Sequence, residues 1–481
     1  MELKDFPNET LDLIISHLFE FADKYDSDAQ NPEHLANARL VCQQWNELAS
    51  RHLFSSIHLR HRSGAFEKWN TMLDNETIRS SVRQVHIDSS PPFEDDYEDE
   101  CDWDLWVRWQ DEGEYPEFID SLNRIGELRN LTSLVLHFGR ACRTGEYDFD
   151  SEASEPLSSR KRTLHAVFDA MAKRTNESPG ATTIRSLTIE NLQNFVLDDF
   201  TGSDAFEQVM QGLKGLHVLV ADEENALDEE READLYRPER QNFEPHLRQA
   251  WLDPIAEQLT SLSLLFHCGW GVMPGKFDTS GLSFPNLRTL HLGAYIIAHH
   301  NQLDWVLRQT TLHTLRLERC AIASHLRIGG GHRQLWDIQD TDWVKHPRGA
   351  FGFNSEDDEI YTFEGTWADV FKAIRESLPN LLDFRFSRFL GSFSLDRPDL
   401  MENEQPHPAR YFTFDTGYCS GWIDDVIQST FDIDDPEPID IGSGPTLYIK
   451  KRRTDRGVKT YEEDLRALED LVASTRRNRS C

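Results

Sequence analysis

A short phrase, apolar-x-x-apolar-x-apolar, recurs along most of the chain and constrains its fold more than any other feature. Apolar side chains two residues apart point to the same side of a β-strand, so each copy predicts a short strand with one face in the core. Helix-like stretches separate several copies, which favours a parallel sheet. The copies are residues 82–87, 131–136, 184–189, 213–218, 259–264, 287–292, 312–317 and 381–386, and the helix-like stretches are 164–172, 254–259, 302–307 and 367–374.

The spacing of the copies indicates an irregular repeat. Central apolar residues lie 28 residues apart (262 to 290) and 25 apart (290 to 315), but other steps reach 53 (134 to 187) and 69 (315 to 384). The copy at 312–317 continues to Cys320 and Ile322, and in this form it resembles the leucine-rich-repeat pattern. The resemblance implies an α/β fold in which residues 56–448 form a degenerate leucine-rich-repeat-like solenoid with a parallel concave sheet. Residues 449–481 follow as a basic C-terminal tail or helix.

Residues between the apolar positions are expected to face outward on the concave wall, where a protein substrate would bind. Histidine occupies the middle of an apolar-x-apolar triplet at four positions, His58, His86, His217 and His291, the last three of which lie in the copies above. A groove whose binding changes near pH 6.5 and a metal-binding strip are two functional interpretations, while neutral imidazoles packed between strands are the structural one. The predicted substrate-binding residues are His86, His137, Glu190, His217, His291, Arg316, Glu318 and Arg385.

The N-terminal segment reads as two amphipathic helices. Pro7 suits the first turn of a helix, where its missing N–H has no partner to lose, and Glu9 places negative charge in that turn. Apolar residues then recur at helical spacing, and a second stripe follows further along. The first stripe is Leu11, Ile14, Ile15 and Leu18; the second is Leu35, Ala38, Val41, Cys42, Trp45, Leu48 and Ala49.

Residues 4–54 resemble the F-box family through Phe-Pro-x-Glu-x-Leu, Ile-Ile-x-x-Leu and Arg-Leu-Val-Cys-x-x-Trp. Phe6 stands where leucine is more usual, and residues 20–34 lengthen the connection between the helices. The resemblance implies that residues 1–55 dock onto a Skp-type adaptor and, through it, a cullin, while the rest of the chain selects the substrate. The implied adaptor-binding residues are Phe6, Pro7, Leu11, Ile15, Val41 and Trp45.

Charge and cysteine usage limit the partners and the compartment. The formal net charge of −34 argues against nucleic-acid binding and makes a basic segment the easier kind of substrate to accommodate. Seven scattered cysteines without a Cys-x-x-Cys pair suggest reduced thiols, and no secretion signal or membrane span is expected. We therefore expect a cytoplasmic or nuclear protein, and the basic clusters at 450–453 and 476–479 read either as an import signal or as balance for the acidic loops.

No group of residues in the sequence predicts catalysis. Nucleophile elbows, phosphate-binding loops and His-Glu-x-x-His helices are absent, and the pairs His267-Cys268 and His299-His300 lack a second pair at zinc-ligand spacing. No cofactor, metal or catalytic residue is predicted. The sequence therefore favours a non-catalytic substrate receptor of a Skp/cullin/F-box ubiquitin ligase. The alternatives are a repeat scaffold outside any ligase and an enzyme with its active site in the repeat array.

Overall fold

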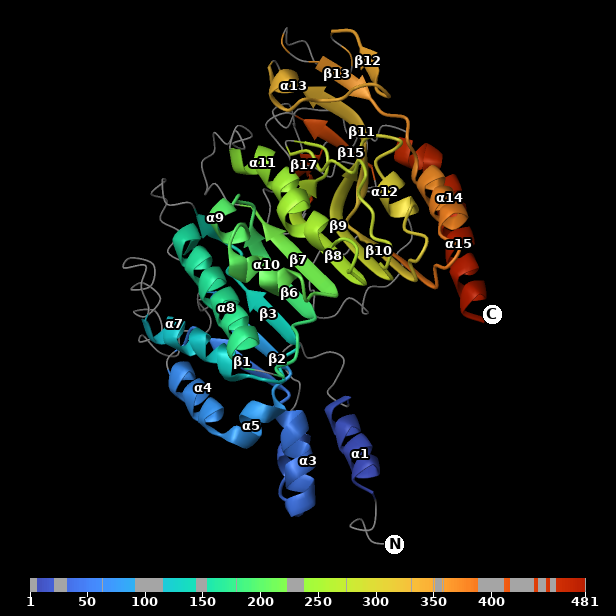
Figure 1. The fold of residues 1–481 in the computed structure, drawn as a ribbon. Coiled ribbons are helices and arrows are strands. Elements are labelled where there is room, and N and C mark those ends of the chain that lie inside the picture. Colours follow the sequence, from blue (N-terminus) through green and yellow to red (C-terminus); the bar gives the residue numbers. More distant parts are fainter. Residues whose placement is uncertain are drawn as a thin grey trace.

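A computed structural model describes residues 7–20, 33–62, 64–90, 116–143, 154–178, 180–222, 238–273, 275–329, 331–348, 350, 357, 359–387, 411–415, 437–439, 447–449 and 456–480. Within these ranges the protein is a mixed α/β structure built on one large, mostly parallel sheet of thirteen strands (Figure 1). The mixed α/β class and the parallel sheet expected from the phrases are confirmed. Phe6, a predicted adaptor-binding residue, lies outside the described ranges.

Consecutive parallel strands form the main part of the sheet, and they pair in the order in which they occur along the chain. Each of the recurring phrases predicted above coincides with one of these strands, so the strand prediction is confirmed at all of them. The strands are β1 (Ser56–Arg60), β2 (Gln84–Asp88), β3 (Ser133–His137), β6 (Ser186–Gln193), β7 (Gly215–Ala221), β8 (Ser261–Trp270), β9 (Thr289–Ile297), β10 (Thr314–Glu318) and β14 (Asp383–Ser387).

The pairing register aligns the phrases residue by residue. The apolar positions of each phrase are buried in one continuous core, and the residues between them form rows on the opposite face. We call this opposite side the polar face. Its first row is Ser56, Gln84, Ser133, Ser186, Gly215, Ser261, Thr289, Thr314 and Asp383, and its second row is His58, His86, Val135, Thr188, His217, Ser263, His291, Arg316 and Arg385.

The sheet branches at β9. The start of β9 pairs with β10, and its last residues, Ile296 and Ile297, pair with β11. β11 continues the sheet into a region with antiparallel neighbours, which the phrases did not predict. The strands of this region are β11 (Ala321–Ile328), β12 (Val344–His346), β13 (Glu359–Thr362) and β15 (Tyr411–Asp415), and separate two-stranded sheets pair β4 (Cys142–Arg143) with β5 (Glu155–Pro156) and β16 (Glu437–Ile439) with β17 (Leu447–Ile449).

Helices cover the apolar side of the sheet. Aromatic side chains such as Trp69, Phe168 and Trp367 extend from them into the core that the strands share. Burying each large aromatic contributes about 2 to 3 kcal/mol, so these contacts are a main source of stability. The helices that follow β1 are α4 (Ala65–Asp74), α5 (Glu76–Ser81), α7 (Pro116–Asn123), η3 (Arg124–Glu127), α8 (Leu157–Glu177), α9 (Asp198–Thr201), α10 (Asp204–Met210), α11 (Pro238–His246), η4 (Leu247–Leu252), η5 (Asp253–Ile255), α12 (Asp304–Leu307), α13 (His332–Leu335), α14 (Trp367–Ser377) and α15 (Arg456–Ser480).

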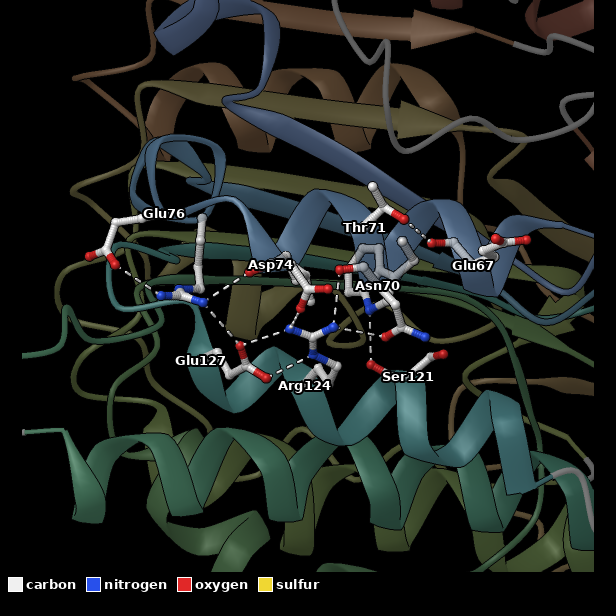
Figure 2. A network of polar contacts seen from close by, with 11 residues as sticks. Glu67, Asn70, Thr71, Asp74, Glu76, Ser121, Arg124 and Glu127 are labelled. Atoms are coloured by element: carbon white, nitrogen blue, oxygen red, sulfur yellow. Dashed lines mark hydrogen bonds and ion pairs between the residues drawn. The ribbon is translucent and has the colours of Figure 1, made fainter.

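A polar network joins α4 to the α7–η3 segment (Figure 2). Arg124 donates to the backbone oxygen of Asn70 over 3.0 Å and forms ion pairs with Asp74 at 2.9 Å and Glu127 at 2.8 Å. The indole nitrogen of buried Trp69 donates to Ser121 O over 3.0 Å. These bonds hold α4 against the α7–η3 segment beside β1 and β2.

The predicted helices have mixed outcomes. The stretch at 164–172 lies within α8 and the stretch at 367–374 within α14, as expected. At 302–307 only the single turn of α12 forms, and at 254–259 there is a 3-10 turn, η5, in place of a helix. Pro254 lies within that turn, and it has no N–H with which to continue a helix from the preceding η4 segment.

Cys320, which lies shortly after the phrase at 312–317, has a clear structural role. Cys320 is buried, and its thiol donates to the backbone oxygen of Leu292 on the neighbouring strand over 3.4 Å. Burial raises the pKa of this thiol to about 12, so it stays protonated and serves as a donor. The cysteine thus ties the residues that follow β10 to the middle of β9.

Candidate interaction surfaces

The N-terminal residues form a three-helix unit with a small core of its own. The unit consists of α1 (Asn8–Glu20), α2 (Glu33–Ala38) and α3 (Gln43–Leu53), and it lies at the β1 and β2 end of the sheet (Figure 1). Gln44 on α3 donates to Asn8 on α1 over 2.6 Å, and His52 pairs with Asp12 at 2.9 Å. The buried core residues, apart from the main core, are Leu11, Ile15, Leu35, Ala38, Leu48 and Ala49.

Four large apolar side chains of this unit are exposed. Leu40 is 84% exposed, Leu13 60%, Val41 57% and Ile14 39%. In the described part of the chain the other exposed large apolar residues are Leu335 and Val344, which belong to α13 and β12. An apolar group concentrated on one small unit is typical of a protein-binding surface. We call Leu13, Ile14, Leu40 and Val41 the apolar patch.

The residues predicted to bind an adaptor divide between the surface and the core of this unit. Val41 is in the apolar patch, Pro7 is exposed just before α1, and Trp45 is half-buried against the core. Leu11 and Ile15 are fully buried, so in this structure they hold α1 against α3 and support the surface from beneath. The predicted adaptor-binding residues did not include Leu13, Ile14 or Leu40 of the apolar patch. Ile14 was assigned to the first apolar stripe but is exposed, and Leu13 and Leu40 are apolar residues outside the helical stripes.

Every predicted substrate-binding residue lies on the polar face or at the ends of its strands. His86, His217, His291, Arg316 and Arg385 share the second row. His137 and Glu190 are register partners two residues further along β3 and β6, and Glu318 has the equivalent position on β10. The sheet therefore places residues that are almost 300 positions apart in the chain, His86 and Arg385, in one row on the same face, with several strands between them.

The middle of the polar face is less exposed than its two ends. His58 and Arg60 on β1 are exposed, and His86 and His137 on the next two strands are half-buried. At the other end Arg316 and Arg385 are half-buried as well, whereas between the ends His291 is 1% exposed and pairs with buried Glu318 at 2.9 Å. The accessible polar groups are therefore at the β1–β3 end, which lies beside the three-helix unit, and at the β10–β14 end.

Two histidines of the polar face, His58 and His217, have pKa values well below 6.5. The rings of His58 and His86 stack with centroids 4.3 Å apart. Desolvation, His86 and Arg60 lower the pKa of His58 to about 4, and burial and His291 lower the pKa of His217 to about 4. These rings are neutral at physiological pH, which agrees with the interpretation of imidazoles packed between strands.

His137 behaves differently from the other histidines of this face. Its Nδ1 is 2.7 Å from the Glu190 carboxylate on the adjacent strand. Burial lowers the pKa of His137, but the hydrogen bond to Glu190 and the charges of Asp88 and Glu155 outweigh it, and the net pKa is raised. An ion pair thus lies on the half-open part of the face, between β3 and β6.

The pair His299-His300 has a structural role. His299 bonds to Asp342 at 2.5 Å and stacks on Trp343, while the backbone N–H of His300 donates to the same carboxylate over 2.9 Å. These contacts dock the segment before β12 onto the end of β9. Nowhere in the described ranges do three His, Cys, Asp or Glu side chains come together as metal ligands.

A buried acid, Glu244, provides a pH-dependent stability test. Glu244 is 6% exposed and accepts a hydrogen bond from Gly271 N over 3.1 Å; burial raises its pKa to about 8, and Asp222 adds to the shift. The pKa of Glu244 is higher in the folded protein than its value of 4.5 in the unfolded chain. Its contribution to the free energy of unfolding is therefore fully present below pH 4.5 and is lost as pH rises through 8. We expect the free energy of unfolding to fall by up to about 4 kcal/mol across that range, and Glu244→Gln to remove that fall.

Urea denaturation between pH 5 and pH 9 measures this effect. The exposed Glu257, changed to Gln, is the matched control and should leave the wild-type pH profile intact. Identical pH profiles for the wild type and Glu244→Gln would contradict the assignment.

Comparisons with known proteins provide no family for this chain. It matches no protein-family model and no curated protein. Among the helices in the described ranges, none combines the length and the apolar character needed to cross a membrane.

Proposed function

We propose that this protein is the substrate-recognition subunit of a Skp/cullin/F-box ubiquitin ligase. The observation that carries the proposal is the three-helix unit, which has its own core and presents Leu13, Ile14, Leu40 and Val41 to solvent. Its sequence resembles an F-box over residues 4–54. In the proposed complex the apolar patch binds a Skp-type adaptor, which links the chain to a cullin.

The rest of the chain would hold the substrate. The parallel strands, their register and the Cys320 contact support a degenerate leucine-rich-repeat-like solenoid, and such arrays present extended binding surfaces. The polar face, with accessible side chains at its β1–β3 and β10–β14 ends, is the candidate surface, and the net charge of −34 favours a protein substrate with a basic segment. No side chain of this protein needs to act on the substrate, because proximity to the ligase accelerates ubiquitin transfer.

Co-purification tests this proposal. The full chain, expressed with a Skp-type adaptor and a cullin, should be isolated as a complex with both, and the partner proteins that it captures should accumulate when the proteasome is inhibited. Failure of the wild-type chain to bind the adaptor would refute the proposal. Binding of the adaptor without recruitment of a cullin would favour the scaffold alternative.

A further inference from the structure

The residues just before the parallel strands form one row, at the end of the sheet where these strands begin. The carbonyl oxygen of Arg83 accepts hydrogen bonds from Thr132 N at 2.8 Å and Ser133 N at 3.1 Å, and the same double contact recurs at every step from β1 to β14. We call this row the basic edge, because of the side chains described next. Its members are Ser55, Arg83, Thr132, Arg185, Lys214, Thr260, Arg288, His313 and Leu382.

The basic edge carries exposed cations and no acidic residue. Two of the cations contact backbone oxygens: Arg83 donates to Ser80 O over 3.3 Å, and Arg185 donates to Gly212 O over 3.4 Å. Within the described part of the chain, no carboxylate forms an ion pair with any of these cations. The exposed cations are Arg83, Arg185, Lys214 and Arg288.

The neighbouring row of the sheet adds almost no negative charge. The first row of the polar face follows the basic edge residue by residue, and its single acid is Asp383. Asp383 is already bound by Arg385 at 3.0 Å and by Arg479 at 2.5 Å. The basic edge is therefore a local concentration of positive charge on a chain whose formal net charge is −34.

We propose that the basic edge binds an extended acidic segment of a partner protein, whose carboxylates pair with the four cations. Neighbouring strands lie about 4.8 Å apart, so the five strand steps from Arg83 to Arg288 span about 24 Å, the length of about seven extended residues. Exposed Arg and Lys side chains without a carboxylate partner keep their donors available for such a segment. The row begins at Ser55, two residues after α3 ends, so the bound segment would lie beside the three-helix unit.

A short acidic segment fits this row better than a nucleic acid does. A nucleic acid carries negative charge along its whole length, and beyond the row it would meet the acidic remainder of the chain. An acidic segment of about seven residues needs to contact only the row itself. The site is separate from the polar face, and its use does not depend on adaptor binding.

Fluorescence anisotropy with the full chain tests the proposal. The probe is a labelled peptide of about eight residues that alternates glutamate and serine, because alternate side chains of an extended peptide lie on one side. We expect Arg185→Glu combined with Lys214→Glu to weaken binding about tenfold, since two ion pairs are replaced by repulsion. Arg83→Glu combined with Arg288→Glu should have the same effect.

Lys68→Glu combined with Arg162→Glu is the matched control. These residues are exposed cations on α4 and α8, outside the row, and the variant has the same change in net charge. It should bind the peptide as the wild type does, and thermal melts verify the fold of all three variants.

Three results would overturn the proposal. They are no binding of the peptide by the wild type, equal weakening by the control and the row variants, and tighter binding of a single-stranded oligonucleotide of the same length than of the peptide. The row variants should still bind a Skp-type adaptor as the wild type does, so a failure at the basic edge is distinguishable from a failure of the proposed ligase function.

Discussion

Replacing Leu40 and Val41 with aspartate is expected to abolish adaptor binding while the protein stays folded. Both side chains are mainly in solvent, so charge is tolerated there in the free protein. In the proposed complex they are buried, and truncating a central apolar contact typically costs at least about 2 kcal/mol. Two such losses weaken the dissociation constant by about a thousandfold. Titration calorimetry with purified Skp-type adaptor measures this change, and a thermal melt verifies the fold.

Leu335→Asp with Val344→Asp is the matched control, because these residues are the other exposed large apolar side chains in the described ranges. This control variant should bind the adaptor as the wild type does. Leu11→Asp is a poor test of the interface, since Leu11 is fully buried and the change would unfold the three-helix unit. Undiminished adaptor binding by the Leu40 and Val41 variant would show that another surface docks the adaptor.

Arg160→Met is expected to lower the free energy of unfolding by about 3 to 5 kcal/mol, because it removes one partner of a buried ion pair. Arg160 and Glu155 are almost fully buried, with Nε and Oε2 3.3 Å apart. Arg160 also donates to Asn191 O over 2.6 Å, and Glu155 accepts from Ser89 Oγ over 2.7 Å. The pair thus joins the start of α8 to the carboxyl ends of β2 and β6. Equilibrium denaturation by urea measures the loss.

The neighbouring ion pair between Lys161 and Asp199 provides the control, since both of its side chains are exposed. Lys161→Ala should cost less than about 1 kcal/mol. Burial already raises the pKa of Glu155, and loss of Arg160 raises it further, so the Arg160→Met defect should grow from pH 5 to pH 8. A pH-independent loss below 1 kcal/mol for Arg160→Met would contradict the buried-pair assignment.

The sheet was predictable because its signal is local. Alternating apolar residues identify a strand whatever surrounds it, and eight similar phrases had to stack in register to bury the same face. His86, His217 and His291 could therefore be assigned to one row from their positions within the phrases, and the register confirms that row. The branch into β11, β12 and β13 carries no such phrase and was not predicted.

The candidate surfaces were predictable only in part. The stripe that contains Leu11 and Ile15 indicates an amphipathic helix, but it does not distinguish residues that face a neighbouring helix from those that face a partner. The exposed Leu40 follows α2 in the turn before α3, where helical periodicity carries no information. The loss of charge at His58 and His217 depends on neighbours from other strands, which a linear pattern cannot reveal.

The sequence by itself determined the short strands, their parallel stacking and the apolar face on which they pack, because these follow from periodicity and burial within each phrase. Only the tertiary structure decided which side chains remain accessible, that His58 and His217 are neutral, and that Arg479 donates to the backbone oxygen of Leu382, 97 residues earlier in the chain. Accessibility, pKa and the packing of α15 all depend on contacts between residues that are distant in sequence. Such contacts exist only once the chain has folded.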